Sequence, residues 1–321
     1  MQDDKEAYLL LILSDANLPT GAFVASSGLE STTAHALFRL PTSSPAGSDI
    51  LTFLRNSVDT YARSALPFAR DAHRIAAAYA SGKTVGLDVA LATLARLDAL
   101  YDASTLNHVT RRASCAQGAA LLTLYTKGFT RPPVLTMISD SMAGITTTAS
   151  NARVPNGDDD QSEYESRAGA LVAALKVCAR RGDADAPGHL PICWGVLAGA
   201  LGLTVGELTA SLLFTSAACH HQHLCPDRGA HLHLFLHARG VLSAAVRMNA
   251  LGPYAAQQLL LHAVKPMLLE AISCTAHLVS GELRDEVHAE LEHEQLPATT
   301  WPLGEILSAR HDLLHSRIFN S

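Results

Sequence analysis

Apolar residues recur at helical spacing along most of the chain, and this pattern limits its fold more than any other feature. Large side chains follow one another three and four residues apart at Leu51, Leu54 and Val58, as they do on the buried face of a helix. No segment alternates apolar and polar residues strongly enough to predict a sheet. The sequence therefore predicts an all-α protein of about ten helices.

The chain has 321 residues, of which 48% are hydrophobic, so it can bury a full core. We predict one helical-bundle-like domain over residues 1–321. Four stretches rich in turn-forming or charged residues interrupt the helical pattern and are predicted to be flexible insertions. They lie near residues 41–48, 139–163, 224–240 and 281–302.

The stretch from Leu9 to Glu30 gives the sharpest local signal. An apolar run ends before Asp15, and Pro19 and Gly21 then break the backbone. Proline fixes φ in such a turn, and glycine suits a position that needs positive φ or a close approach.

A second helix is expected from about Ala22, which would place Phe23, Ser27 and Glu30 on one face. Gly28 would lie inside this helix, where a glycine costs about 0.5–1 kcal/mol relative to alanine. A backbone packed closely against Gly28 would explain that cost. The residues alone indicate a helical hairpin with a glycine at its crossing point, and they name no reaction.

Three later blocks accompany this opening stretch. A helix over 107–124 carries the paired Arg111 and Arg112, and His189 precedes a buried helix over 192–202. The third block, over 246–260, contains a basic residue, a Leu-Gly turn and a downstream glutamine, and its proline is placed to begin a helix. These are Arg247, Gly252, Pro253 and Gln257.

Together these blocks resemble the urease accessory protein F family. The opening motif is long and specific: Leu13-Ser14-Asp15-x-x-Leu18-Pro19-Thr20-Gly21-x-Phe23-x-x-Ser26-x-Gly28-Leu29-Glu30. The chain departs from the family at Ala25, where many bacterial members carry histidine or an aromatic residue. No metal-ligand role is carried over to that position.

The resemblance implies a non-enzymatic maturation factor for urease, which is a nickel enzyme. Such proteins are expected to be helical dimers that bind a second accessory protein, called D or H. The pair then recruits the accessory GTPase G and docks on apo-urease to assist nickel insertion, with the F component modulating or gating the GTPase. No prosthetic group is implied, because the complex handles nickel as cargo.

The resemblance also implies a set of partner-binding residues in the matching blocks and in the terminus over 309–319, which resembles the family's ending. They are Asp15, Pro19, Gly21, Phe23, Ser26, Gly28, Glu30, Arg111, Arg112, Arg247, Gly252, Gln257, Arg310, His311, Ser316, Arg317 and Phe319.

The last twenty residues are predicted to form an amphipathic helix with Arg310 and Arg317 along one side. A chain end carrying leucine, isoleucine and phenylalanine needs a surface on which to bury them. That surface can be the protein's own core or a partner, and the resemblance favours the D/H accessory protein.

Histidines are concentrated between residues 220 and 237. The first group comprises His220, His221, His223 and Cys225, and it is followed by His231, His233 and His237. Imidazole and thiolate ligands suit nickel, copper or zinc, so the first group is a candidate metal site. The alternative function is therefore an independent nickel- or transition-metal-binding protein.

Charge and cysteine usage exclude several other classes. The net charge is −6 without a block of Lys and Arg, which argues against nucleic acid and membrane as partners. Six scattered cysteines without a Cys-x-x-Cys pair, and an acidic N-terminus without a signal peptide, indicate a cytoplasmic protein.

No catalytic motif is present. Ser81-Gly82-Lys83-Thr84 resembles the end of a phosphate-binding loop, but Ala77 occupies the place of its first glycine. No Gly-x-Ser-x-Gly elbow occurs either. A hydrolase of an unrecognised kind is the remaining enzymatic alternative, and it would need a pocket with perturbed titratable groups.

Overall fold

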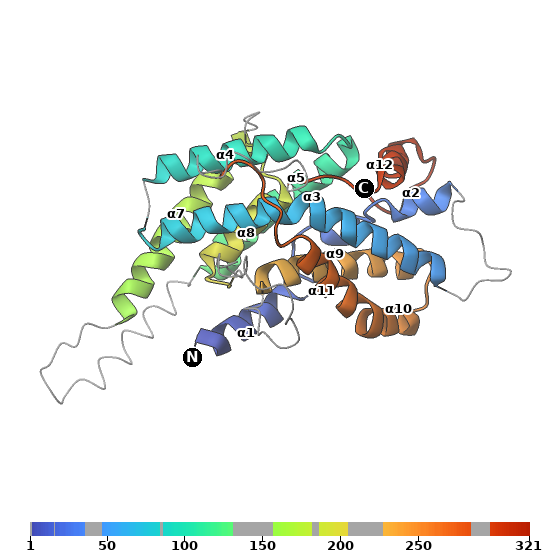
Figure 1. Cartoon of the computed structure of the whole chain (residues 1–321), viewed down its shortest axis with the longest axis horizontal. Helices are drawn as coiled ribbons and strands as arrows, with labels where there is room; N and C mark the ends of the chain where they lie inside the picture. The colour runs from blue at the N-terminus through green and yellow to red at the C-terminus, as the bar shows by residue number, and fades with distance from the viewer. Residues whose placement is uncertain are drawn as a thin grey trace, which may run out of the picture.

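The computed structural model describes residues 2–15, 17–35, 47–83, 86–130, 157–181, 186–204, 227–283 and 296–321. These ranges contain helices and no strand, which confirms the predicted all-α class (Figure 1). The α-helices are α1 (Gln2–Leu13), α2 (Leu29–Ala34), α3 (Ser48–Ala80), α4 (Leu87–Ser104), α5 (His108–Leu124), α7 (Gly157–Arg181), α8 (Leu190–Ala200), α9 (Arg228–Arg247), α10 (Pro253–Leu259), α11 (Lys265–Cys274) and α12 (Pro302–Ala309). Short 3₁₀ or π-helical turns are η1 (Ala22–Val24), η2 (Tyr125–Phe129), η4 (Leu260–Val264) and η7 (Arg310–Leu313).

Helix α3 runs through the middle of the molecule and joins two hydrophobic clusters (Figure 1). Its first half, including Leu54 and Val58, packs with α9 and α11, whereas Phe68 and Ala72 in its second half pack with α4, α5, α7 and α8. The helix continues through Pro67, although a proline removes a backbone hydrogen bond there. The predicted stripe over 51–58 is thus confirmed as core.

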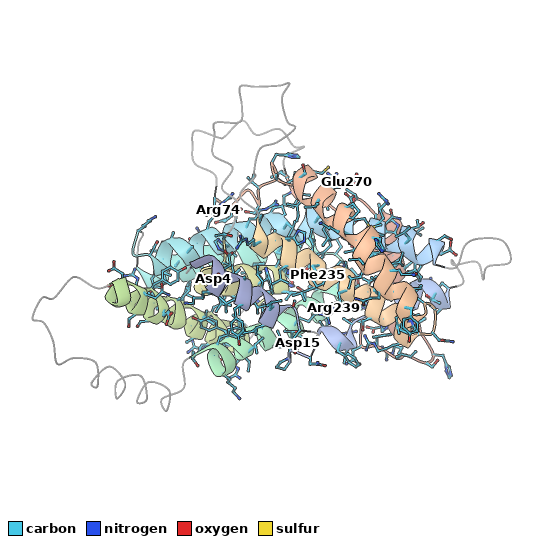
Figure 2. The ribbon with its side chains drawn as sticks, turned by 90° about the horizontal axis from the view of Figure 1, so that it is seen from below. Asp4, Asp15, Arg74, Phe235, Arg239 and Glu270 are labelled. Carbon is cyan, nitrogen blue, oxygen red and sulfur yellow. The ribbon has the colours of Figure 1, made fainter. Side chains whose placement is uncertain are left out.

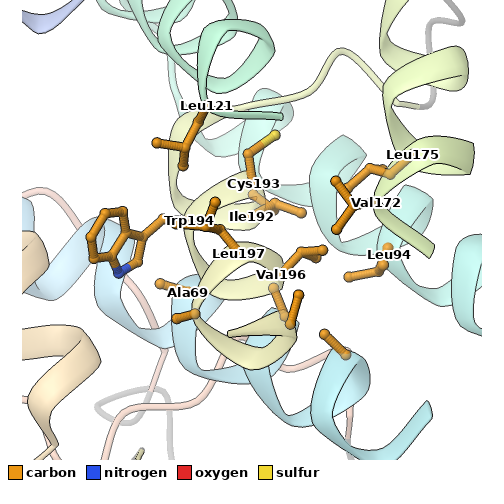
Figure 3. Packing of buried hydrophobic residues seen from close by; sticks show 14 of the residues in the cluster. Ala69, Leu94, Leu121, Val172, Leu175, Ile192, Cys193, Trp194, Val196 and Leu197 are labelled. Carbon is orange, nitrogen blue, oxygen red and sulfur yellow. The ribbon is translucent and has the colours of Figure 1, made fainter. Parts of the chain in front are cut away.

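Helix α8 is buried along its whole length between α3, α5 and α7 (Figure 3). Small residues let it approach α3 closely: a Cβ atom built on Gly195 would lie 2.2 Å from the carbonyl oxygen of Ala69. Gly118 of α5 makes a similar approach, because a Cβ there would lie 2.0 Å from the carbonyl oxygen of Gly188. These glycines set the distances between the central helices.

Two histidines of the cluster noted in the sequence belong to the core. Residues 228–240, expected within an insertion, form the first part of α9, because Asp227 caps the helix through the backbone N–H of Ala230 at 2.9 Å. His233 Nε2 lies 2.9 Å from the hydroxyl of Tyr61, and His237 Nε2 lies 2.9 Å from that of Ser57. Helix α7 similarly begins at residue 157, inside the expected 139–163 insertion.

Burial keeps these two imidazoles neutral: it lowers the pKa of His233 to about 3 and that of His237 to about 4. In the unfolded chain both should titrate near 6.5, so the unfolded state binds more protons below that pH. The free energy of unfolding should therefore fall as the pH decreases from about 6.5 toward 4, by about 1.4 kcal/mol per pH unit for each histidine.

Urea unfolding of the protein and of His237→Phe at about pH 7 and about pH 5.5 checks this expectation. The phenylalanine keeps the stacking on Tyr61, whose ring centroid lies 4.3 Å from that of His237, but it cannot bind a proton. The variant should lose less stability on acidification. Equal losses in the two proteins would contradict the assignment.

Helix α1 is tied to the rest of the molecule by one buried carboxylate. Glu6 accepts hydrogen bonds from the backbone N–H and the hydroxyl of Thr204, both at 2.8 Å, and from Arg228 at 2.8 Å. Thr204 and Arg228 stand on either side of residues 205–226, so Glu6 holds both flanks of that segment at one point.

Among the described helices, none combines the length and apolar character needed to cross a membrane.

Candidate partner-binding site

The opening motif contains two glycines with a left-handed backbone conformation, one before and one after a short 3₁₀ helix. Gly21 has φ 74° before η1, and Gly28 has φ 83° before α2. Both conformations favour glycine, since a Cβ atom would be strained there. The predicted helix from Ala22 is therefore wrong, and Gly28 precedes a helix instead of interrupting one.

Glu30, at the start of α2, binds the C-terminal tail, which we define as residues 314–321. Its carboxylate accepts hydrogen bonds from the backbone N–H groups of Ile318 at 2.5 Å and Phe319 at 3.1 Å. Nε2 of His311 lies 2.9 Å from the same carboxylate. Glu30 and His311 are both buried, so this group of charge-assisted hydrogen bonds is shielded from water.

The residues before α2 extend this attachment. Ser26 donates to the carbonyl oxygen of Ser321 through its backbone N–H at 2.6 Å and its hydroxyl at 2.9 Å. The backbone N–H of Asn320 donates to the carbonyl oxygen of Val24 at 2.9 Å. Ser26 is fully buried by these contacts. The short polar side chain of the motif thus serves the tail.

Asp312 joins the tail to α5. Its carboxylate accepts a bidentate pair of hydrogen bonds from Arg112, at 2.8 and 2.9 Å, and a further one from Arg317 at 2.9 Å. The Arg112 hydrogen bonds hold the pKa of Asp312 well below its usual range. Arg112 also donates to the carbonyl oxygen of Asn320 at 3.2 Å.

Arg247 connects three of the sequence blocks. Its guanidinium carbon lies 3.9 Å from the ring centroid of Phe23 and 4.4 Å from that of Phe319, and it donates a hydrogen bond to the carbonyl oxygen of Phe23. Cation–π contacts of this kind are typical of Arg between aromatic faces. Arg247 therefore holds the opening motif, the end of α9 and the tail together.

Helix α12, which precedes the tail in the chain, packs against α2 (Figure 1). A Cβ atom on Gly28 would lie 3.0 Å from Cβ of Ser308, and the hydroxyl of Ser31 donates to the carbonyl oxygen of Leu307 at 2.5 Å. The close approach inferred for Gly28 is therefore present, although its neighbour is the side chain of Ser308.

Gly28→Leu should lower the free energy of unfolding by about 1–3 kcal/mol, because the side chain meets Ser308 and the residue keeps a positive φ. Chemical denaturation measures the change. Gly252→Leu is the control, since no atom lies within 4 Å of a Cβ built at that glycine. A wild-type midpoint for Gly28→Leu would contradict the packing described here.

The tail packs against other parts of the same chain. A segment that becomes ordered only on a partner would not have these contacts. Phe319 is 2% exposed within the cluster of α3, α9 and α11. The predicted terminal amphipathic helix is also wrong: α12 ends at Ala309, η7 follows, and Leu314 is extended. Arg310 and Arg317 consequently do not share a helix side, and Arg310 instead donates to His35 at 3.3 Å.

Other predicted residues lie away from the tail. Asp15 caps its own loop by accepting from the backbone N–H of Asn17 at 2.9 Å, and Arg239 of α9 binds the adjacent carbonyl oxygen of Ser14 (Figure 2). Arg111 donates to the carbonyl oxygen of Thr105 at 2.9 and 3.0 Å. These contacts are structural.

A buried polar group lies beside Arg111. His189 is fully buried, with Nε2 3.0 Å from the carboxylate of Asp102. Asp98 accepts the backbone N–H groups of Gly188 at 2.6 Å and His189 at 3.0 Å. Burial raises the pKa of the neighbouring thiol of Cys115 to about 11, so it is held as a neutral thiol. A reactive thiolate is not favoured here.

The remaining predicted residues are on the surface. Gly252 and Gln257 are exposed at the start of α10, and Ser316 is exposed in the tail. Pro19 lines a groove beside α5, and Gly21 lines a different one beside the tail. Four of the predicted residues are buried within the chain: Ser26, Glu30, His311 and Phe319. Their contact with a partner stays a prediction.

The candidate metal ligands lie outside the described residues. They are His220, His221, His223 and Cys225. Within the described ranges, no group of three or more His, Cys, Asp or Glu side chains is arranged to hold a metal ion. His315, four residues after His311, is exposed whereas His311 is buried.

Sequence reasoning missed Asp312, Asn320 and Ser31, which complete the attachment of the tail. Asp312 lies in the sequence among the residues that we predicted. Because η7 ends at Leu313, Asp312 and Arg317 do not share a helix, and their spacing gives no helical pattern. Only the fold brings it to Arg112, two hundred residues earlier.

Exposed apolar side chains belong to the elements that adjoin the docked tail, and we call them together the tail surface. It consists of side chains of η1, α12, η7 and the tail that are each more than half exposed: Phe23, Leu303, Ile306, Leu313 and Ile318. A groove of about 760 Å³ adjoins it, lined by residues that include Gly21, Arg112 and Phe319. Exposed apolar side chains on adjoining elements are candidates for protein association.

Comparison with known proteins gives consistent matches. The profile of the UreF family matches residues 47–218 and 210–264. Urease accessory protein 6 of Cryptococcus neoformans var. grubii is 34% identical over 347 aligned residues, covering 99% of this chain and 98% of that protein. The uncharacterized urease accessory protein UreF-like of Schizosaccharomyces pombe is 25% identical, covering 98% and 97%. Urease accessory protein F of Arabidopsis thaliana is 25% identical, covering 96% and 90%.

Proposed function

Because the chain belongs to the UreF family of urease accessory proteins, we propose that it binds the D/H accessory protein and, with it, the GTPase G and apo-urease. In this complex it assists nickel insertion by modulating or gating the GTPase. Its family gives it a role in urease maturation, whereas the partners and the gating are our proposal. Nickel is the cargo of the assembly.

The tail surface is the observation that carries the proposal. Its apolar side chains stand on a base fixed by Glu30, Asp312 and Arg247, so they are presented in a set arrangement. A preorganised surface loses little conformational freedom on binding. The names of the similar proteins describe accessory proteins, which accords with a binding role and no catalysis of its own.

A second exposed face supports the proposal of a homodimer. Tyr254, Leu261 and Leu269 on α10, η4 and α11 are each more than half exposed. Their separations are seven and eight residues, and the wider π-helical turn of η4 accommodates the extra residue. The motif residues Gly252 and Gln257 are exposed on the same helical run. We assign this face to a second copy of the chain.

The double variant Leu313→Asp/Ile318→Asp tests the assignment of the tail surface. Charges placed there should weaken co-purification with the D/H accessory protein at least about tenfold, since they would be buried unpaired. Circular dichroism should be unchanged, because both side chains are exposed. Urease activation in cells that lack the native chain should fall in parallel.

Leu261→Asp is the matched control on the other face. It should leave the D/H protein bound and reduce dimerisation, measured by light scattering. If the double variant still binds the D/H protein as tightly as the unmodified chain, the tail surface is not its binding site.

A further inference from the structure

A second groove, distinct from the tail surface, runs between α5 and α7. It encloses about 520 Å³ and is lined mostly by apolar atoms. Small residues of α5, Ala119 and Ala120, form its accessible floor, and Pro19 of the opening motif lines it as well. A floor of alanines allows another helix to approach closely.

Three cations border this groove. Lys127 comes from η2, and Lys176 and Arg180 come from α7. Lys176 Nζ donates to the hydroxyl of Thr126 at 2.6 Å. Lys127 and Arg180 have neither a hydrogen bond nor an ion pair from their side chains to any part of the chain that the structure describes.

Within the described part of the chain, no acidic residue that lines this groove balances its positive charges. Partial burial lowers the pKa of Lys176, and the charges of Arg180 and Lys127 lower it further. The whole chain carries a net charge of −6, whereas all three charged residues described at this groove are cations. An anionic partner would relieve this repulsion.

We propose that the α5–α7 groove binds an acidic amphipathic helix of a partner protein. The apolar side chains of that helix cover Ala119, Ala120 and Pro19. Its carboxylates pair with Lys127, Lys176 and Arg180. This is the helix-in-groove mode of recognition, with a charged rim that selects the partner.

A small anion alone fits the groove less well. It would pair with the cations and leave the alanine floor exposed to water, whereas an amphipathic helix covers the alanines and pairs with the cations. The chemistry of the occupant follows from the groove itself. That it belongs to the D/H protein, the GTPase or apo-urease rests on the proposed function.

The test places the photo-crosslinking amino acid benzoylphenylalanine at position 120, in the groove, or at position 173 as the control. Ala173 is an exposed alanine of α7 that does not line the groove. Each full-length variant is irradiated with the purified D/H protein, GTPase and apo-urease, and the crosslinked peptide is identified by mass spectrometry. We expect an adduct from position 120 only, on an acidic amphipathic segment.

Charge reversal then tests the rim. Arg180→Glu should lower the yield of this adduct at least about tenfold, and a Glu→Lys change in the crosslinked segment should restore it. Lys83→Glu, at an exposed lysine that follows α3, should have no effect. Circular dichroism of each variant confirms that it is folded.

Three outcomes would overturn the proposal: no adduct from position 120, an adduct on a segment without acidic residues, or an adduct that joins two copies of this chain. Each of them leaves the proposed function open to its own test, because co-purification through the tail surface is measured separately. If Leu313→Asp/Ile318→Asp still co-purifies with the D/H protein as the unmodified chain does, an acidic adduct from position 120 would leave the groove assigned and the tail surface not.

Discussion

Replacing Glu30 by alanine should release the C-terminal tail and abolish binding of the D/H accessory protein. The carboxylate holds the backbone N–H groups of Ile318 and Phe319 and lies 2.9 Å from His311 Nε2. All three donors would lose their acceptor in a buried site. Removing one member of such a group costs about 3–5 kcal/mol, which is comparable to the stability of a weakly held segment.

Hydrogen exchange measures this release directly. The amides of Ile318 and Phe319 should be protected in the unmodified protein and exchange rapidly in Glu30→Ala, while amides in α3 and α8 keep their protection. Glu30→Gln retains one acceptor oxygen and should show a smaller effect. Glu163→Ala, at an exposed carboxylate on α7, serves as the control and should change nothing. Protected tail amides in Glu30→Ala would refute the role given to this carboxylate.

Replacing Gly195 by alanine should destabilise the whole fold. A methyl group there would lie 2.2 Å from the carbonyl oxygen of Ala69 and 2.8 Å from Cβ of Ala72. Both neighbours belong to the central helix, so α8 must move away from α3. Overpacking of this kind costs about 1–3 kcal/mol, and more where backbone atoms oppose it. We expect a loss near the top of that range in urea unfolding.

Gly240→Ala is the matched control for this experiment. Gly240 also lies inside a helix, but no atom lies within 4 Å of a Cβ built on it. Alanine should therefore raise stability there by about 0.5–1 kcal/mol through its higher helix propensity. Opposite signs for the two Gly→Ala changes would establish that close packing, and not helix propensity, governs Gly195. Equal effects would refute this explanation.

The sequence was sufficient to predict helices in the regions of α3, α5 and α10, because their signals are local. Leu54 and Val58 are core and Leu51 packs against it, Asn107 caps α5 by accepting the backbone N–H of Val109 at 3.0 Å, and Pro253 begins α10. Each of these depends on spacing or on a side chain within one turn of the helix.

The turns around Gly28 and the tail could not be predicted in the same way. A glycine with positive φ and a glycine inside a helix look alike in the sequence, and only the contact with Ser308 distinguishes them. The chain end posed a similar problem. Its apolar residues showed that it needs a surface, but the surface is created by Glu30, Arg112 and Arg247, which are far away in the chain.

The candidate site was found in part because a family motif marked its residues. The motif named Ser26, Glu30 and Phe319 without indicating that they are buried against one another. The α5–α7 groove had no such marker. Its cations stand on η2 and α7, on either side of residues 131–156, and only the packing of α5 against α7 brings them to one rim.

The position of Glu6 has a consequence for how this protein can vary between species. Glu6 binds both Thr204 and Arg228. The spacer between them, residues 205–226, therefore begins and ends near the same carboxylate. Doubling the length of such a closed spacer costs only about 0.6 kcal/mol in loop-closure entropy. Evolution can therefore lengthen, shorten or recompose residues 205–226, histidines included, while α8 and α9 keep their places. The carboxylate at position 6 should be retained wherever that variation occurs.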